Sequence, residues 1–245
     1  MVHVLDYALT IFGYALASAI VAASVVRGYL RRYFYLNLYV VALCAFDALR
    51  YAFLRAYGFR SPQYFYAYFL TDAISVILAY LLILGFFDIL FRNSPLRAQV
   101  RVALFLFFAL VAGTSYIFIS HSVSHFYSRL VVEFQQNMYF AALVLTVLLL
   151  VSLAHLRVRD RQLGLLITGL GIFAPAPAGG YALQNLLPRD LFEALSELTR
   201  RVPALATLAM LSLWCYALVQ VPTEAGTPAQ APALEPAKAA AGAKS

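Results

Sequence analysis

Seven long apolar runs organise the first 221 residues, and short segments rich in charge, proline or glycine separate them. A helix needs about 20 apolar residues to cross a hydrocarbon core of about 30 Å, and each run is near that length. In lipid, only helices and closed barrels satisfy all their backbone hydrogen bonds. The pattern therefore predicts an all-α, polytopic membrane protein, a bundle of seven transmembrane helices. The expected spans are Val4–Val26, Phe34–Leu54, Tyr64–Phe91, Val102–Ile119, Leu130–Leu156, Leu163–Leu186 and Val202–Val221.

The two ends of the chain differ from these runs. Met1–Tyr7 contains no Lys or Arg and carries Asp6, so it lacks the basic start of a cleavable signal peptide, and we expect the first run to remain as a helix. From residue 222 the composition changes to Ala, Pro, Thr, Gly and Lys. We expect residues 1–221 to form the transmembrane domain and residues 222–245 to form a disordered cytoplasmic tail. Between the last two spans, Pro188–Arg201 is amphipathic and predicts a short helix lying in the membrane interface.

Composition and charge support this assignment. The chain is 63% hydrophobic and 12% charged, about half the charged share of an average soluble domain. A net charge of +7 would suggest nucleic acid as a partner of a soluble protein, but the arginines here fall between apolar runs and instead set orientation in the membrane. One set of loops and the tail carry 11 of the 18 basic residues, which predicts an outside N-terminus and a cytoplasmic C-terminus. The excess of Arg over Lys is typical of a GC-rich bacterial genome and favours the bacterial inner membrane.

Polar side chains within the spans are the candidates for function, because a charge at the bilayer centre costs about 3 kcal/mol or more. They come from the second, third, fifth and sixth spans, and by helix geometry they lie in the outer half of the bilayer, within about 12 Å of its surface. A pocket open to the outside would gather them, whereas the alternative is structural glue in which Asp47 pairs with Arg50 and the amides bond across helices. The candidates for ligand binding or proton coupling are Asp47, Arg50, Asp72, Glu133, Gln136, Asn137, Tyr181 and Gln184.

The sixth span contains two prolines and two glycines within six residues: Pro175, Pro177, Gly179 and Gly180. Proline removes a backbone donor and clashes with the preceding turn, so we expect this helix to break or kink here. Broken helices at mid-membrane depth are typical of binding sites in transporters, although plain kinks are also common.

The sequence excludes several chemistries. Retinal needs a lysine within the bundle, and the only lysines, Lys238 and Lys244, lie in the tail. His121 and His125 have the spacing of a metal-binding pair, but no third ligand adjoins them, so no metal is predicted. No nucleophile-elbow, P-loop or dinucleotide motif is present, which favours a non-enzymatic role without a cofactor.

The segments LNLYVVALCAFDALRYAFLRAYGF (Leu36–Phe59) and FQQNMYF (Phe134–Phe140) resemble those of a group of uncharacterised bacterial seven-helix membrane proteins. The resemblance covers the seven spans and implies their topology but no activity. We therefore expect a protein that binds or senses a small ligand from the outer side in an intramembrane polar pocket. Arg50 would contact an anionic group of the ligand or balance Asp47, and Asp72 and Glu133 would set polarity or take up protons. A proton-coupled secondary transporter and an accessory subunit of a larger membrane complex are the alternatives, and a sensor would need a cytoplasmic or membrane protein partner.

Overall fold

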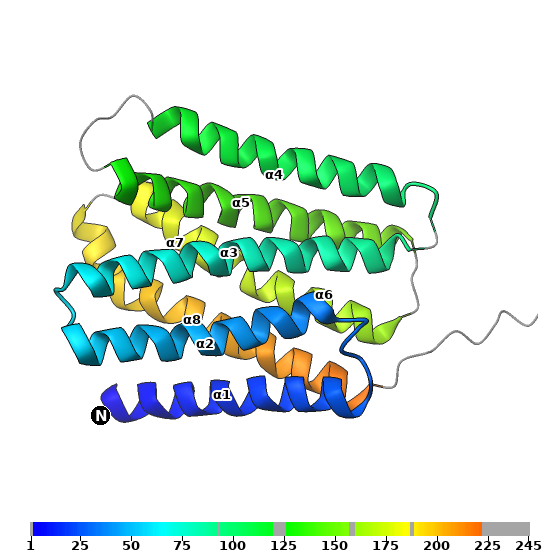
Figure 1. Cartoon of the computed structure of the whole chain (residues 1–245), viewed down its shortest axis with the longest axis horizontal. Helices are drawn as coiled ribbons and strands as arrows, with labels where there is room; N and C mark the ends of the chain where they lie inside the picture. Colours follow the sequence, from blue (N-terminus) through cyan, green and yellow to red (C-terminus); the bar gives the residue numbers. More distant parts are fainter. Residues whose placement is uncertain (1, 93, 120–125, 157–159, 187–188, 222–245) are drawn as a thin grey trace, which may run out of the picture.

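The structure is a computed structural model that describes residues 2–92, 94–119, 126–156, 160–186 and 189–221. These residues form helices and no strand (Figure 1). Seven helical segments in the described part are long and apolar enough to cross a membrane, as expected of a multi-pass membrane protein. The helices are α1 (Val2–Val26), α2 (Phe34–Tyr57), α3 (Pro62–Leu90), α4 (Arg97–Ile119), α5 (Phe126–His155), α6 (Arg161–Phe173), α7 (Pro175–Leu186) and α8 (Arg189–Gln220).

Short local signals end one helix and start the next. Gly28 and Gly58 have φ angles of 70° and 79°, which glycine adopts without strain, and they turn the chain after α1 and α2. Ser61 accepts a hydrogen bond from the Tyr64 N–H, with Pro62 in the first turn of α3. Asp160 caps α6 in the same way by accepting from the Leu163 N–H.

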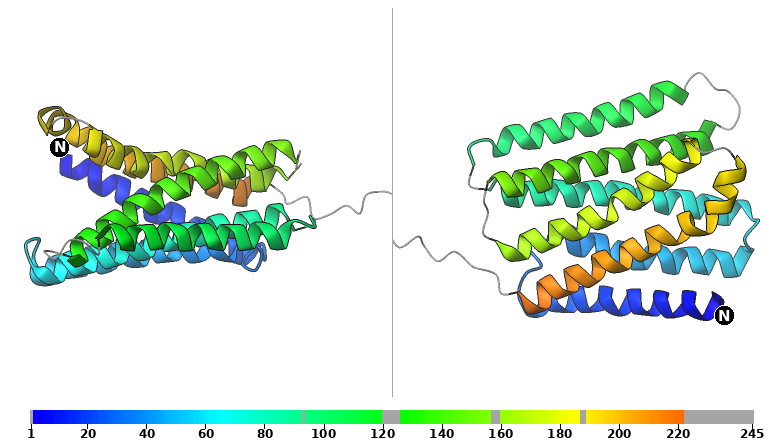
Figure 2. Two further views of the ribbon diagram at one scale, coloured as in Figure 1. Left: turned by 90° about the horizontal axis from the view of Figure 1, so that it is seen from above. Right: turned by 180° about the vertical axis from the view of Figure 1, so that it is seen from behind.

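Six spans form a closed ring, in which α1, α2, α3, α5, the α6–α7 pair and α8 each contact the next and α8 returns to α1. The fourth helix lies outside this ring against α3 and α5 (Figures 1 and 2). The connections alternate between two ends of the bundle. We call the end with the start of α1 and the α2–α3 turn the N-terminal end, and the end with the α1–α2 and α3–α4 turns the opposite end (Figure 1).

The sixth span is interrupted as the prolines predicted. Helix α6 ends at Phe173 and α7 begins at Pro175, whose ring leaves no backbone donor at that point. Ala174 between them keeps helical dihedral angles (φ −56°, ψ −39°), so the interruption is a kink and not an unwound loop. Pro177, Gly179 and Gly180 continue α7 without a further break.

The segment Pro188–Arg201 is helical from Arg189 on, as predicted, but it is not a short helix of its own. The described part of this segment belongs to α8, which continues through Pro203 to Gln220. In Figures 1 and 2 the first turns of α8, in yellow, lie at an angle to the rest of the helix, in orange. No glycine or asparagine lies between Arg189 and Pro203 to end the helix, so the amphipathic segment and the last span remain one element.

Toward the opposite end of the bundle, α6 and α8 pack closely around a buried tryptophan. Trp214 is fully buried and donates from Nε1 to the Leu166 carbonyl at 2.8 Å. Nearby, the Tyr33 hydroxyl donates to Gln162 Oε1 at 3.0 Å, and Gln162 Nε2 donates to the Ala217 carbonyl at 3.2 Å. Burial raises the pKa of Tyr33, because desolvation disfavours the charged phenolate.

Candidate functional site

An ion pair between two neighbouring spans marks the candidate site. Arg50 of α2 donates from Nε to Thr71 Oγ1 at 2.7 Å, and its Nη2 lies 3.3 Å from Asp72 Oδ1 of α3. The guanidinium also lies over the Tyr68 ring, 4.7 Å from the ring centroid, in a cation–π contact. Arg50 and Asp72 each keep a side-chain exposure of 20%, so the pair is neither sealed in the core nor free in solvent.

A cavity of about 240 Å³ lies beside this pair inside the ring of spans. Its walls come from α2, α3, α5, α6 and α8, so nearly every span of the ring contributes. The polar side-chain groups other than the ion pair are hydroxyls from four different helices, on Tyr39, Ser75, Tyr139 and Thr207. The lining residues are Tyr39, Leu43, Arg50, Asp72, Ser75, Ala79, Tyr139, Phe173, Pro203, Ala204 and Thr207.

The kink between α6 and α7 and the proline inside α8 both adjoin this cavity. Phe173 is the last residue of α6 before the kink, and Pro203 lies inside α8, where it removes one backbone donor. Thr207 donates its hydroxyl back to the Pro203 carbonyl at 2.8 Å. Irregular backbone at membrane depth is tolerated where it is buried in protein or lines a cavity, and here it lines a cavity.

A second cavity of about 380 Å³ adjoins the first and shares Leu43, Ala204 and Thr207 with it. It lies among α1, α2 and α8, and it is mainly apolar apart from Thr10, Tyr14, Cys44, Asp47 and Thr207. Asp47 lines this second cavity and is 57% exposed. Its Oδ1 lies 4.0 Å from Arg50 Nη1, a longer contact than the Arg50–Asp72 pair.

The structure brings together only part of the predicted set. Asp47, Arg50 and Asp72 lie close together. Arg50 pairs more closely with Asp72 than with Asp47, whereas the structural alternative predicted an Arg50–Asp47 pair. The residues from α5 diverge from them. Glu133 is exposed, and Asn137 donates to Ser115 Oγ of α4 at 2.9 Å.

The remaining candidates are outside the cavity or outside the described part. Gln136 is half-buried and lines neither cavity. Tyr181 and Gln184 are in α7, but their side chains fall outside the described residues, as do His121, His125 and the tail 222–245. Among the described residues, no group of three or more His, Cys, Asp or Glu side chains could hold a metal ion.

Sequence reasoning missed the hydroxyl groups of the site. Thr71 and Ser75 lie on the same helix as Asp72, and Tyr139 lies in the same segment as Asn137. Hydroxyls are less costly in lipid than charges and amides, so they do not stand out in an apolar run. Ser75 lies three residues after Asp72 and so on the same helix face, which was the available signal for Ser75. Thr71 is adjacent to Asp72 in sequence, and that spacing gives no such signal.

Known proteins add no further evidence to this geometry. A scan against models of protein families finds no match, and neither curated proteins nor solved structures yield one.

Proposed function

We propose that this chain is a non-enzymatic protein of the bacterial inner membrane that binds a small ligand in the cavity beside Arg50 and Asp72. The observation that carries the proposal is that one ion pair and several hydroxyls line a cavity built by five helices. An Arg–Asp pair is expensive to keep in a membrane if it does no more than hold two helices together.

The cavity chemistry suits a small polar molecule with an acidic group. Arg50 has five N–H donors, and the contacts to Thr71 and Asp72 use two of them. Ser75, Tyr139 and Thr207 add hydroxyls that bind neutral polar groups. A volume of about 240 Å³ is below the roughly 300–1,000 Å³ of sites for drug-sized ligands, so the ligand is a smaller metabolite.

In this proposal the N-terminus is outside and the C-terminus is cytoplasmic. The N-terminal end of the bundle then faces outward, and the ligand enters from that side. Arg50 lies seven residues from the end of α2, which corresponds to about 10 Å of helix. Toward the opposite end the interior is closed by buried apolar side chains such as Leu36, Ile83 and Leu166. That closure favours a sensor over a transporter, and a sensor passes its signal to a separate cytoplasmic or membrane protein.

Thermal unfolding with a panel of small carboxylates and zwitterions tests the proposal. We expect one compound class to raise the midpoint, because a ligand at 100 times its Kd stabilises the folded state by about 2.7 kcal/mol. Ser75→Leu fills the cavity and leaves Arg50 and Asp72 in place, so it should lose the effect. Thr168→Leu is the control, since Thr168 is exposed on α6. A ligand that stabilises wild type and Ser75→Leu equally would contradict binding in this cavity.

A proton-coupled transporter is the second candidate, favoured by the α6–α7 kink and the proline inside α8, both of which adjoin the cavity. In that case the span containing α6 and α7 would move about its kink, and Asp72 would exchange a proton during the cycle. Uptake of the identified ligand into proteoliposomes, driven by a proton gradient and abolished by Asp72→Asn, would support transport. Binding without uptake would support the sensor.

A further inference from the structure

A second polar feature lies at the opposite end of the bundle, far along α2 and α3 from the candidate site. A groove of about 320 Å³ runs between α2, α3 and α4. A smaller hollow of about 130 Å³ shares Tyr35 and Asp88 with it and adds Arg31 and Arg32 from the α1–α2 turn. The residues that line the groove are Tyr35, Leu84, Phe87, Asp88, Arg97, Val100, Arg101 and Leu104.

The rim of the groove carries excess positive charge. Asp88 accepts hydrogen bonds from Arg97, with Nε 2.9 Å from Oδ1, and from Arg101 Nη2. One carboxylate therefore holds two guanidinium groups side by side, which leaves one net positive charge. Arg31 is exposed and adds another, whereas Arg32 pairs with Asp160. Arg101 is 65% exposed, so its remaining donors can reach a ligand.

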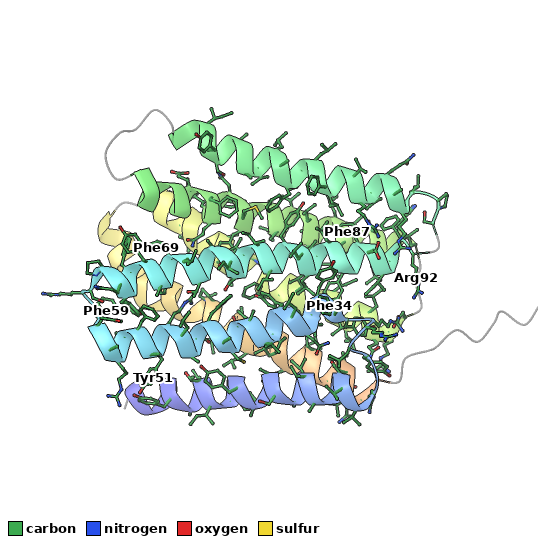
Figure 3. All side chains as sticks on the ribbon, in the orientation of Figure 1. Phe34, Tyr51, Phe59, Phe69, Phe87 and Arg92 are labelled. Atoms are coloured by element: carbon green, nitrogen blue, oxygen red, sulfur yellow. The ribbon has the colours of Figure 1, made fainter. Side chains whose placement is uncertain are left out.

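The groove changes from charged to apolar with depth. Asp88 lies two residues before the end of α3 and Arg97 is the first residue of α4, so the charges lie at the ends of the spans. Leu84 lies one turn deeper on α3, and Leu104 lies about 10 Å deeper on α4. Figure 3 shows Phe34 and Phe87 in the half of the bundle toward Arg92, whereas Phe59 and Phe69 lie in the other half.

We propose that this groove binds an anionic phospholipid, with its acidic headgroup at Arg31, Arg97 and Arg101 and an acyl chain along Leu84, Val100 and Leu104. The charge on the rim selects an anionic over a zwitterionic headgroup, and basic pockets between spans are known to suit such lipids. Helix α4 lies outside the ring of spans, so the groove beside it faces the surrounding lipid. Asp88 is a positioning residue that holds the two arginines of α4 together.

A charge-matched pair of variants tests the headgroup contact. Arg31→Gln/Arg101→Gln removes two positive charges from the rim, and Arg55→Gln/Arg60→Gln removes two exposed charges near the α2–α3 turn at the N-terminal end. Native mass spectrometry from detergent would measure retention of phosphatidylglycerol against phosphatidylcholine. We expect wild type and the control to prefer phosphatidylglycerol, and the groove variant to bind it roughly tenfold more weakly. Equal loss in both double variants, or no loss in the groove variant, would overturn the proposal.

A filling variant tests the acyl-chain contact. Val100→Phe narrows the apolar wall and keeps every charge of the rim, so it should also weaken phosphatidylglycerol binding. If Val100→Phe binds the lipid as wild type does, the groove holds no acyl chain. In that case the headgroup contact alone accounts for lipid binding, and the proposal that the groove holds a whole phospholipid fails.

Discussion

Arg50 carries a full positive charge within a membrane-spanning helix, and its three neighbours on α3 determine how that charge is accommodated. Asp72 supplies the opposite charge, Thr71 accepts from Nε, and Tyr68 offers the face of its ring. A guanidinium suits this arrangement because its planar fork donates in several directions and stacks on an aromatic ring, which an ammonium group does not do equally well. The side chain is therefore fixed at the wall of the cavity and is not drawn toward the membrane surface.

A double-mutant cycle measures how much this pair contributes to stability. Arg50→Gln leaves the Asp72 carboxylate without its charge partner in a partly buried position, and we expect a loss of about 1–3 kcal/mol in the free energy of unfolding. Asp72→Asn should cost a similar amount for the same reason. The double variant should lose less than the sum, because neither charge is then left alone. Chemical unfolding in detergent would measure all four proteins, and strict additivity would show that the two side chains do not interact.

At the scale of elements, the close approach of α6 and α8 depends on one glycine. A Cβ atom at Gly169 would lie 2.6 Å from Trp214 Nε1 and 2.8 Å from its Cδ1. Trp214 cannot move aside easily, because it is fully buried and donates to Leu166. Small residues at such contacts let membrane helices pack backbone against side chain without a void.

Gly169→Ala and Gly164→Ala form a matched pair that tests this packing. We expect Gly169→Ala to lose about 1–3 kcal/mol of stability through overpacking against Trp214. Gly164→Ala should be neutral or slightly stabilising, since its Cβ would lie 3.7 Å from Leu153 Cδ2 and alanine is the better helix former. Trp214 is the only tryptophan, so its fluorescence reports the contact directly. A Gly169→Ala protein with unchanged emission and unfolding midpoint would contradict the expected clash.

The pattern of apolar runs was sufficient to predict the seven spans and the kink at Pro175, because both follow from local sequence. It was not sufficient to predict which helix faces meet. Glu133 and Asn137 share a stripe on α5, but α5 packs on α4 as well as on α3, and Asn137 turns to Ser115 of α4. No local signal in the sequence predicts that α4 lies outside the ring. The periodicity of each helix shows which polar side chains share a face, but it does not show whether the faces of different helices meet in one pocket.

The excess of arginine at one end of the bundle gives the whole molecule its predicted orientation. The loops at the opposite end carry Arg27, Arg31 and Arg32 before α2, and Arg92 before α4. Because the connections alternate between the two ends of the bundle, a membrane crossed by all seven candidate spans separates those ends. The two proposals use that direction, because the proposed ligand enters from the N-terminal end and the groove proposed for a phospholipid lies at the opposite end.

Two glutamine-to-cysteine variants test the orientation without altering any charge. Gln63 lies in the first turn of α3 at the N-terminal end, Gln99 lies in the first turn of α4 at the opposite end, and both are exposed. A membrane-impermeant maleimide should label Gln63→Cys in intact spheroplasts and Gln99→Cys only after lysis, because the positive-inside rule places the arginine-rich end in the cytoplasm. Cys44 and Cys215 lie within spans and are partly buried, so wild type provides the background. The reverse labelling pattern would show that the orientation is opposite to the predicted one. The cavity beside Arg50 and Asp72 would then be reached from the cytoplasm, and its ligand would be a metabolite of the cell interior.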